Sequence, residues 1–259
     1  MSNQLRIFKD ATAIMTGGAS GIGRAMALEL VSRGCTVVLA DRQIALAEEL
    51  AASIVASGGN AWARELNVCD YNAVKVLVEE TVAKTGRLDY MFNNAGIAGG
   101  GRIVDTPDAE WDRVMATNVD SVWHLSRAFA QRLIERKQAG AIINIASMLS
   151  YFGGGLVPAY SASKGGISQL TKSLAIAYAP DGIRVNAISP GPMKTLAGAA
   201  IGGARKTYKF ADNNAPLGSN ATLEAVGGTA VYLASDAGAC TTGEIIHVDG
   251  GFHVLGMPQ

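Results

Sequence analysis

Two tyrosine–lysine pairs with three residues between the partners are candidates for acid–base chemistry. Tyr160 and Lys164 form one pair, and Tyr71 and Lys75 form the other. A free phenol titrates near pKa ~10, and a neighbouring ammonium lowers that value because it stabilises the phenolate. In a helix, side chains four residues apart lie one turn apart on the same face. A pair of this kind could therefore exchange a proton with a bound oxygen near neutral pH.

The surroundings of the two pairs differ, and only one of them has a hydroxyl at a useful distance along the chain. Ser147 lies thirteen residues before Tyr160, directly after the apolar run 141–146. Gly58 occupies the corresponding position before Tyr71. A serine at the end of a strand can donate a hydrogen bond to an oxygen that gains negative charge. We therefore predict the reactive site at Tyr160 and interpret the pair at Tyr71 as coincidental.

A glycine-rich turn indicates a binding site for a phosphate-bearing ligand. The residues TGGASGIG occupy positions 16–23, after the apolar run 11–15 and before a helical pattern that starts at Arg24. Glycines let the backbone bend tightly and let a pyrophosphate approach the N–H groups at a helix start. The spacing G-x3-G-x-G differs from the commoner dinucleotide pattern G-x-G-x-x-G, and an ordinary strand-to-helix turn is the alternative. The contacts expected from this turn are Gly17, Ser20, Gly21, Ile22 and Gly23.

Asp41 adds a second feature of a dinucleotide site. It ends the apolar run TVVLAD, 18 residues after Gly23. An acidic side chain at this place can accept hydrogen bonds from the ribose hydroxyls of adenosine, and it would repel a 2′-phosphate. Arg42 points the other way, because an arginine beside the ribose could pair with that phosphate. We expect NAD(H) rather than NADP(H); a helix N-cap before 43–57 is the alternative role of Asp41.

These residues are spaced along a regular alternation of strand and helix patterns. Short apolar runs alternate with longer segments of helical period, as in a parallel sheet wrapped by helices. Several runs are apolar at successive positions, which is typical of strands covered on both faces. The sequence predicts one α/β domain over residues 1–259, doubly wound around a seven-stranded parallel sheet. The strands are expected at 11–15, 36–40, 61–66, 88–92, 141–146, 183–189 and 244–248, and the helices at 21–33, 43–57, 71–85, 107–137, 159–179 and 222–235.

Composition disfavours several other classes of function. Lysine plus arginine and aspartate plus glutamate both count 22, so the chain has no net charge to attract nucleic acid. Charged or polar residues interrupt every stretch before the roughly 18 apolar residues that a membrane span needs, and the N-terminus lacks a secretory pattern. We expect a cytoplasmic protein with no nucleic-acid or membrane partner.

The cysteines and histidines do not predict a metal site or a disulfide framework. The three cysteines are far apart in the sequence, and the three histidines lack ligand spacing on a common helix. We expect buried thiols, histidines that serve packing, and no metal. The residues concerned are Cys35, Cys69, Cys240, His124, His247 and His253.

Taken together, the motifs resemble those of the short-chain dehydrogenase/reductase family over nearly the whole chain. That resemblance implies a Rossmann-type enzyme that moves hydride between a nicotinamide ring and the carbon of an alcohol or ketone, usually as a homotetramer. Small residues of the segment 159–179 would let its helix pack closely against a partner; they are Ala162, Gly165, Gly166 and Ser168. The matching pieces are 16–23, Asp41, NNAG at 93–96, Asn118, Ser147, Tyr160, Lys164, Pro190, Gly191 and TGEIIHVDGG at 242–251.

The resemblance also implies a role for each catalytic residue. Tyr160 would be the general acid in reduction and the general base in oxidation. Lys164 would bind the nicotinamide ribose and activate the tyrosine. Ser147 would orient and polarise the substrate oxygen, and Asn118 would hold a water that connects the lysine to solvent.

Further cofactor contacts are expected where other strands end, because ligands of such sheets sit outside the carboxyl ends of the strands. Asn67 replaces the aspartate that many family members carry beside the adenine, and its amide oxygen could still accept a hydrogen bond from the adenine amino group. Thr195 is expected to bind the carboxamide. The full set is Asn67, Val68, Asn94, Ala95, Gly96, Pro190, Gly191, Met193 and Thr195, with Tyr160 and Lys164 at the nicotinamide.

The substrate is expected to be small and neutral, a ketone, secondary alcohol or polyol. The segment 147–155 is similar to sugar-acid dehydrogenases of the family, which favours an acidic substrate instead. The segment 190–220 has no regular pattern and predicts a mobile lid. No arginine or lysine is evidently placed to bind a substrate carboxylate. The apolar residues expected around the substrate are Met148, Tyr151, Phe152, Met193 and Leu196.

Two alternative functions are open. One is enoyl-thioester reduction, because the segments 215–228 and 250–257 resemble bacterial enoyl-acyl-carrier reductases. The spacing of the catalytic pair disfavours this function, since those enzymes have six residues between tyrosine and lysine and this chain has three. The other is a non-catalytic dinucleotide-binding or structural subunit. Degenerate catalytic positions would mark such a subunit, and none of the positions is degenerate.

Overall fold

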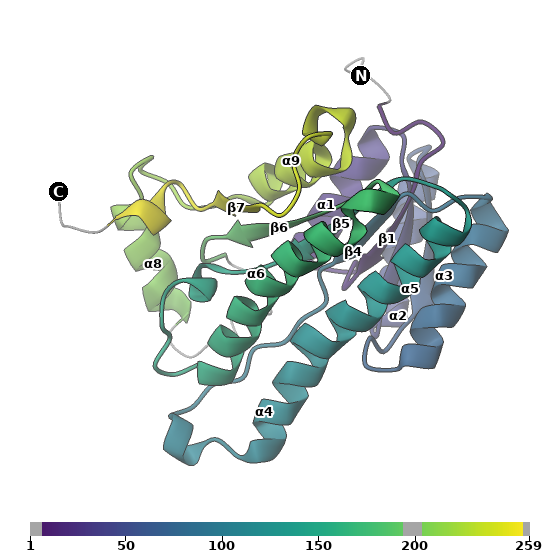
Figure 1. The fold of residues 1–259 in the computed structure, drawn as a ribbon. Helices are drawn as coiled ribbons and strands as arrows, with labels where there is room; N and C mark the ends of the chain where they lie inside the picture. The colour runs from purple at the N-terminus through teal and green to yellow at the C-terminus, as the bar shows by residue number, and fades with distance from the viewer. Residues whose placement is uncertain (1–6, 194–203, 256–259) are drawn as a thin grey trace.

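The computed structural model describes residues 7–193 and 204–255, and its centre is one parallel sheet of seven strands (Figure 1). The strand order is β3-β2-β1-β4-β5-β6-β7, so the chain winds outward from β1 in one direction and then, from β4, in the other. This order confirms the predicted doubly wound α/β fold. The strands are β1 (Thr12–Thr16), β2 (Thr36–Asp41), β3 (Asn60–Glu65), β4 (Tyr90–Asn93), β5 (Gly140–Ile145), β6 (Ile183–Pro190) and β7 (Ile245–Val248).

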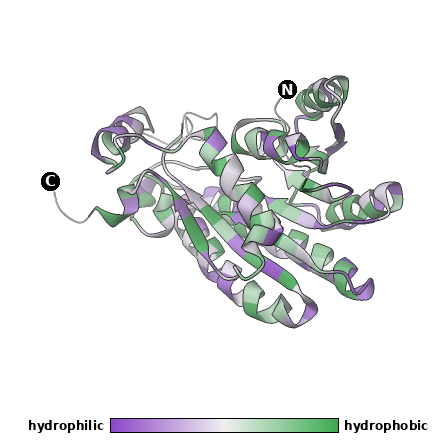
Figure 2. Ribbon diagram, turned by 90° about the horizontal axis from the view of Figure 1, so that it is seen from above, coloured by the Kyte–Doolittle hydropathy of each residue, from purple (hydrophilic) through white to green (hydrophobic). Residues whose placement is uncertain are grey.

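Helices cover both faces of the sheet. Successive strand residues point to opposite faces, so residues on either side are buried under helices. Ala13 and Met15 of β1 belong to a core cluster with residues of α1 (Gly21–Ser32), α2 (Ile44–Ala56) and α9 (Leu223–Ala234). Ile14 packs on the other face with residues of α3 (Tyr71–Thr85), α5 (Ser121–Glu135) and α6 (Pro158–Tyr178). Figure 2 shows hydrophobic and hydrophilic bands on these helices. The longer helices are α1 (Gly21–Ser32), α2 (Ile44–Ala56), α3 (Tyr71–Thr85), α4 (Asp108–Met115), α5 (Ser121–Glu135), α6 (Pro158–Tyr178), α8 (Ala204–Asn214) and α9 (Leu223–Ala234).

The sequence pattern over 107–137 predicts one helix, and the structure has an uninterrupted helical segment from Asp108 to Glu135. Within it, a π-helical segment η2 (Ala116–Asp120), which the pattern does not predict, joins α4 to α5. Asn118 lies in this segment with both side-chain polar atoms bound to groups outside the helix. Extra residues in a helical turn often mark functional positions, because they redirect a side chain.

The stretch 190–220 also differs from the prediction, because α8 forms within it. Thr195 and Leu196 lie outside the described residues. Short helical turns complete the fold: η1 (Ile103–Asp105), η3 (Met148–Ser150), η4 (Ala179–Asp181), η5 (Asp236–Gly238) and η6 (Phe252–Val254). Within the described ranges, every helix is too short or too polar to cross a lipid bilayer.

Candidate active site

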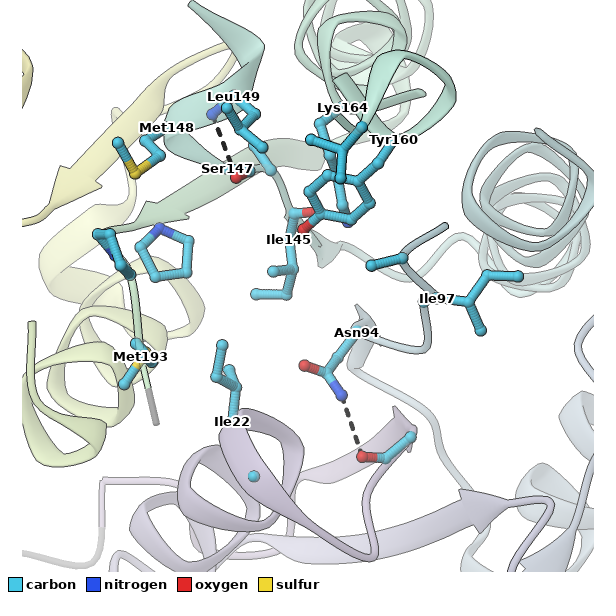
Figure 3. Close-up of a pocket in the computed structure, with 18 of the residues that line it drawn as sticks. Ile22, Asn94, Ile97, Ile145, Ser147, Met148, Leu149, Tyr160, Lys164 and Met193 are labelled. Atoms are coloured by element: carbon cyan, nitrogen blue, oxygen red, sulfur yellow. Dashed lines mark hydrogen bonds between the residues drawn. The ribbon is translucent and has the colours of Figure 1, made fainter. Parts of the chain in front are cut away.

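A cavity of about 1020 Å³ lies where the carboxyl ends of the strands meet, and most of the predicted site residues line it. Figure 3 shows Ser147, Tyr160 and Lys164 gathered on one side of it. Gly23 and Asn118 lie behind its wall. The predicted residues on the wall are Gly17, Ser20, Gly21, Ile22, Asp41, Asn67, Val68, Asn94, Ala95, Gly96, Ser147, Tyr160, Lys164, Pro190, Gly191 and Met193.

The glycine-rich turn packs so closely that side chains would not fit at two of its positions. Gly17 has a φ of +63°, a conformation that L-residues rarely adopt. A Cβ added at Gly23 would lie 2.2 Å from the carbonyl oxygen of Gly17. Helix α1 begins at Gly21, and the side chain of Ser20 does not cap it. The turn therefore presents the N–H groups of a helix start to the cavity, a shape and charge that fit a pyrophosphate.

Asp41 joins the glycine-rich turn to the end of β2. Its carboxylate accepts hydrogen bonds from the backbone N–H groups of Ala19, at 3.1 Å, and Gln43, at 3.0 Å. Gln43 is the N-cap residue of α2, so Asp41 does not hold the N-cap position itself. The carboxylate and the neighbouring Arg42 both line the cavity, at the end that would hold adenosine.

Asn94 supports the turn from the neighbouring strand. Its Nδ2 donates to the carbonyl oxygens of Thr16, at 2.9 Å, and Gly17, at 3.0 Å. Figure 3 marks one of these bonds. The Thr16 hydroxyl accepts from the backbone N–H groups of Asn94 and Ala95, at 3.1 and 3.2 Å. The side-chain amide of Asn94, which the sequence predicts at the cofactor, thus holds the glycine-rich turn in place.

Ser147 and Tyr160 meet at the substrate end of the cavity. Ser147 follows β5, and Tyr160 lies in the first turn of α6. The Ser147 hydroxyl accepts a hydrogen bond from the Leu149 N–H at 3.2 Å, and Ser147 and Tyr160 both line the cavity. Burial raises the pKa of Tyr160 above its usual value, and the neighbouring Ser147 hydroxyl opposes that effect. Two hydroxyl groups are therefore in place to share one bound oxygen.

The expectation that Lys164 lowers the pKa of the Tyr160 phenol stays a prediction, because in the structure the lysine binds the backbone. The Lys164 side chain is buried, and its Nζ donates to the Ile145 carbonyl oxygen at 2.7 Å. Nζ lies 5.7 Å from the centre of the Tyr160 ring, and burial lowers the pKa of Lys164 to about 8. The ammonium is thus held by the backbone and is itself easily neutralised, which leaves burial as the larger influence on the phenol.

Asn118 fixes the wall behind Lys164. Its Oδ1 accepts from the Ile97 N–H at 2.9 Å, and its Nδ2 donates to the Ile97 carbonyl at 2.9 Å and to the Ser163 hydroxyl at 3.0 Å. A Cβ added at Gly96 would lie 3.3 Å from Asn118 Oδ1 and 3.7 Å from Lys164 Nζ. Asn118, Gly96 and Lys164 are therefore neighbours, as the sequence motifs predict.

The wall around the substrate end contains residues that sequence reasoning missed. Phe210 of α8 and Phe252 of η6 line the cavity beside the predicted Met148 and Phe152. Tyr151 was expected there, but its ring packs against His247 with a centroid distance of 4.8 Å, and Tyr151 does not line the cavity. An aromatic residue inside a stretch predicted as a lid was the one signal that could have identified Phe210.

The second tyrosine–lysine pair lies elsewhere. Lys75 Nζ stands 4.2 Å from the centre of the Tyr71 ring, on α3, and Arg127 of α5 stands 4.7 Å from it. Tyr71 and Lys75 do not line the cavity. The interpretation of this pair as coincidental agrees with that position.

Two histidines that the sequence assigns to packing lie beside an aspartate. One potential ligand atom from each of His247, Asp249 and His253 lies within 4.8 Å of the others. However, the two histidine rings stack with an interplanar angle of 14°, so their in-plane lone pairs do not converge on one point. His253 Nδ1 also binds the Asp249 carboxylate at 2.9 Å, and that carboxylate accepts from two backbone N–H groups as well. The arrangement is that of a packed, hydrogen-bonded stack.

Comparison with known proteins gives one consistent result. A family model described as Enoyl-(Acyl carrier protein) reductase matches residues 17–253. The 2-dehydro-3-deoxy-D-gluconate 5-dehydrogenase of Dickeya dadantii is 35% identical over 240 residues, which cover 93% of this chain and 94% of the relative. The secoisolariciresinol dehydrogenase of Forsythia intermedia is 37% identical, with 96% of this chain and 91% of the relative covered.

A solved structure of an NAD(P)-dependent dehydrogenase has the same fold as this chain. It is described as a putative NAD(P)-dependent gluconate 5-dehydrogenase from Beutenbergia cavernae with NADP bound at low occupancy. Its TM-score is 0.88 at 36% identity, and the match covers 96% of this chain and 99% of that one. The two chains therefore share the same fold over almost their whole length.

Proposed function

Because the chain belongs to the short-chain dehydrogenase/reductase family and is an NAD(P)-dependent oxidoreductase of secondary alcohols or ketones, we propose that Tyr160 performs the proton transfer of this reaction. The position of the Tyr160 phenol beside Ser147 on the cavity wall supports this proposal (Figure 3). When bound, the nicotinamide supplies hydride in reduction and accepts it in oxidation. The Tyr160 hydroxyl gives its proton to the carbonyl oxygen in reduction and takes it back in oxidation.

The other polar residues support this proton transfer. Ser147 donates a hydrogen bond to the substrate oxygen as negative charge develops there, which stabilises the transition state. Lys164 binds the nicotinamide ribose and, once turned toward the phenol, favours its ionised form. Asn118 holds the loop at Ile97 and lies on the route by which Lys164 recovers protons from solvent. The family resemblance and the contacts between these residues support the assignments.

We further propose that the enzyme prefers NAD(H). The Asp41 carboxylate lines the adenosine end of the cavity, and its negative charge would repel a 2′-phosphate. Gly17, Ser20, Gly21, Ile22 and Gly23 would form the pyrophosphate cradle. Asn67, Val68, Asn94, Ala95, Gly96, Pro190, Gly191 and Met193, together with Thr195 outside the described residues, complete the proposed contacts.

The substrate proposed is a neutral secondary alcohol or ketone. Among described residues, the only ionisable groups on the cavity wall besides Tyr160 are Asp41, Arg42 and Lys164, and the first two lie at the adenosine end. Lys164 Nζ is bound to the Ile145 carbonyl. A carboxylate buried at the substrate end would thus lack a charged partner, which is costly. This substrate differs from the gluconate derivative in the name of the Dickeya relative, which is an acid.

A substrate panel tests the proposed function. With NADH, the enzyme should reduce cyclohexyl methyl ketone faster than the matched ketone that carries a 4-carboxylate, and NADH should give a higher kcat/KM than NADPH. Crotonyl thioester should not be oxidised or reduced, since three residues separate tyrosine and lysine. Faster reduction of the acid, or turnover of crotonyl thioester alone, would overturn the proposed substrate class.

We propose that the chain forms one domain and works as a homotetramer in the cytoplasm. The continuous sheet supports the single domain, and the family resemblance supports the tetramer. Helix α8, which places Phe210 on the cavity, would be part of a substrate lid over about 190–220. Light scattering during gel filtration tests the assembly and should give four times the chain mass of 26.8 kDa.

A further inference from the structure

Three phenylalanines from separate segments meet at the substrate end of the cavity. Phe152 follows η3, Phe210 belongs to α8, and Phe252 opens η6. The ring centroids of Phe152 and Phe252 are 6.1 Å apart with an interplanar angle of 70°. Those of Phe210 and Phe252 are 5.8 Å apart at 87°. Phe252 is thus the central ring of an edge-to-face cluster, which we call the phenylalanine cluster.

The cluster belongs to the same cavity as the proposed catalytic hydroxyls, and it is not sealed inside the protein core. All three rings line the cavity that Ser147 and Tyr160 also line. Phe210 is 60% exposed, and a large aromatic side chain exposed at a cavity wall has apolar surface left to bury. A bound apolar group that reaches this part of the cavity would cover that surface.

The chemistry around the cluster selects against charged or strongly polar partners. Most of the other lining residues of these segments are apolar, and Thr207 of α8 adds one hydroxyl; the apolar ones are Met148, Leu149, Leu156, Val157 and Leu255. A hydrophobic wall of this kind binds any apolar group in proportion to the buried area. Aromatic rings add a geometric preference, because a planar ring can stack on their faces or meet them edge to face.

We propose that the phenylalanine cluster is the specificity-determining element of the substrate site and that it recognises a planar aromatic ring next to the reacting carbinol or carbonyl carbon. This inference rests on the proposed function, since it names the substrate class of the same site. The three rings form a corner whose walls are nearly perpendicular, so a flat ring contacts more than one of them at once. A saturated ring of equal size gains the buried area but not the aromatic contacts.

The test compares acetophenone with cyclohexyl methyl ketone, two neutral methyl ketones that differ in the aromaticity of the ring. Steady-state KM and kcat are measured with saturating NADH for the wild type and for Phe252→Leu, Phe152→Leu and Phe210→Leu. Because the two ketones differ in intrinsic reactivity, the quantity compared is the ratio of their KM values in each variant relative to the wild type. Phe210 is exposed, so its replacement does not threaten folding.

We expect each leucine variant to raise the KM of acetophenone by about 2- to 12-fold relative to that of cyclohexyl methyl ketone, with the largest effect at Phe252. The kcat values should change little, because the cluster does not touch the reacting oxygen. Tyr151→Leu is the matched control: its ring lies on the same loop but packs on His247, away from the cavity, and the KM ratio should stay at the wild-type value.

Two results would overturn the inference, and they are distinguishable. If the wild type reduces both ketones and every variant has the wild-type KM ratio, the phenylalanine cluster does not discriminate aromatic from saturated rings. The proposed function would still stand. If the wild type reduces neither ketone, the proposed neutral substrate class is wrong and the inference is wrong with it.

Discussion

Ser147 is the residue with the simplest chemical task, because its hydroxyl carries no charge and makes only short-range contacts. Ser147 and Tyr160 lie on the same side of the cavity wall (Figure 3), so their two hydroxyl groups can both donate to one bound oxygen. Donors arranged in advance around a developing oxyanion need no reorganisation during the reaction. The effect of removing this hydroxyl should therefore fall on the chemical step.

Ser147→Ala should lower kcat by about 10²- to 10³-fold and leave the Kd of NADH near its wild-type value. Rapid-mixing kinetics and NADH fluorescence titration measure the two quantities. Ser168→Ala is the matched control, because Ser168 lies on α6 away from the cavity and its buried hydroxyl has no hydrogen-bond partner. A kcat above one tenth of the wild-type value in Ser147→Ala would contradict the role assigned to this serine.

Lys164 makes the stability of the cofactor-free enzyme depend on pH. Burial lowers its pKa from 10.5 to about 8, so between these values the unfolded chain binds more protons than the folded one. The free energy of unfolding then rises with pH in this window, by at most about 1.4 kcal/mol per pH unit. Below pH 8 the lysine is charged in both states, and its contribution no longer changes.

Urea unfolding of the wild type and Lys164→Met at pH 7.5 to 9.5 tests this linkage. The difference in unfolding free energy, wild type minus variant, should grow more positive as the pH rises above 8. Comparing the two proteins cancels shared groups such as Tyr90, whose pKa burial raises to about 12. A difference that stays constant across this range would show that Lys164 is not the buried, easily neutralised group described above.

At the scale of elements, the glycine-rich turn packs so closely against the first turn of α1 that there is no space for a side chain at Gly23. Gly23→Ala forces a methyl group to within 2.2 Å of the Gly17 carbonyl oxygen unless the turn moves. We expect the Kd of NADH to rise about 10- to 100-fold, since overpacking costs roughly 1–3 kcal/mol. Fluorescence titration measures the change.

Gly228→Ala provides the comparison for this prediction. Gly228 lies exposed on α9, and an added Cβ would meet no atom within 4 Å. This variant should bind NADH normally and gain up to about 1 kcal/mol of stability, because alanine has the higher helix propensity. Equal NADH affinities in the two variants would contradict the steric account of the turn.

A buried polar chain links strands β4 and β5 to α6 below the cavity. Asn93 Nδ2 donates to Asn144 Oδ1 at 2.8 Å, and Asn144 Nδ2 donates to Thr171 Oγ1 at 2.9 Å. Asn144→Ala should lower the free energy of unfolding by about 1–3 kcal/mol, because it leaves buried partners unpaired. Thr171→Val should lower the free energy of unfolding by less in the Asn144→Ala background than in the wild type. Urea unfolding of the two single variants and the double variant measures this difference. Strictly additive losses would show that the two residues do not interact.

At the scale of the whole molecule, the order of elements was readable because the strands are buried on both faces. Runs such as 36–40 and 141–146 are apolar at nearly every position, and glycines and polar residues separate them from the helices. The π-helical turn at Asn118 could not be predicted from the sequence, because the partners of this side chain, Ile97 and Ser163, are distant in sequence. The periodicity of apolar residues along a helix does not indicate which distant residues will form hydrogen bonds with it.

The candidate site divides in the same way. Glycine turns and strand ends follow from topology, so Gly17, Asp41 and Ser147 were found at the cavity. Phe210 and Phe252 were missed, since only folding brings α8 and η6 together. The hydrogen bond from Lys164 Nζ to the Ile145 carbonyl could not be predicted either, because it depends on the packing of α6 against β5.

The account depends most on Tyr160 as the proton donor, and Tyr160→Phe tests this most directly. The variant should bind NADH with a Kd within about threefold of the wild type, while its single-turnover rate of ketone reduction falls by about 10²- to 10⁴-fold. Stopped-flow measurement of NADH fluorescence gives both values from one protein preparation. A variant that reduces the ketone at a rate near that of the wild type would contradict the central claim.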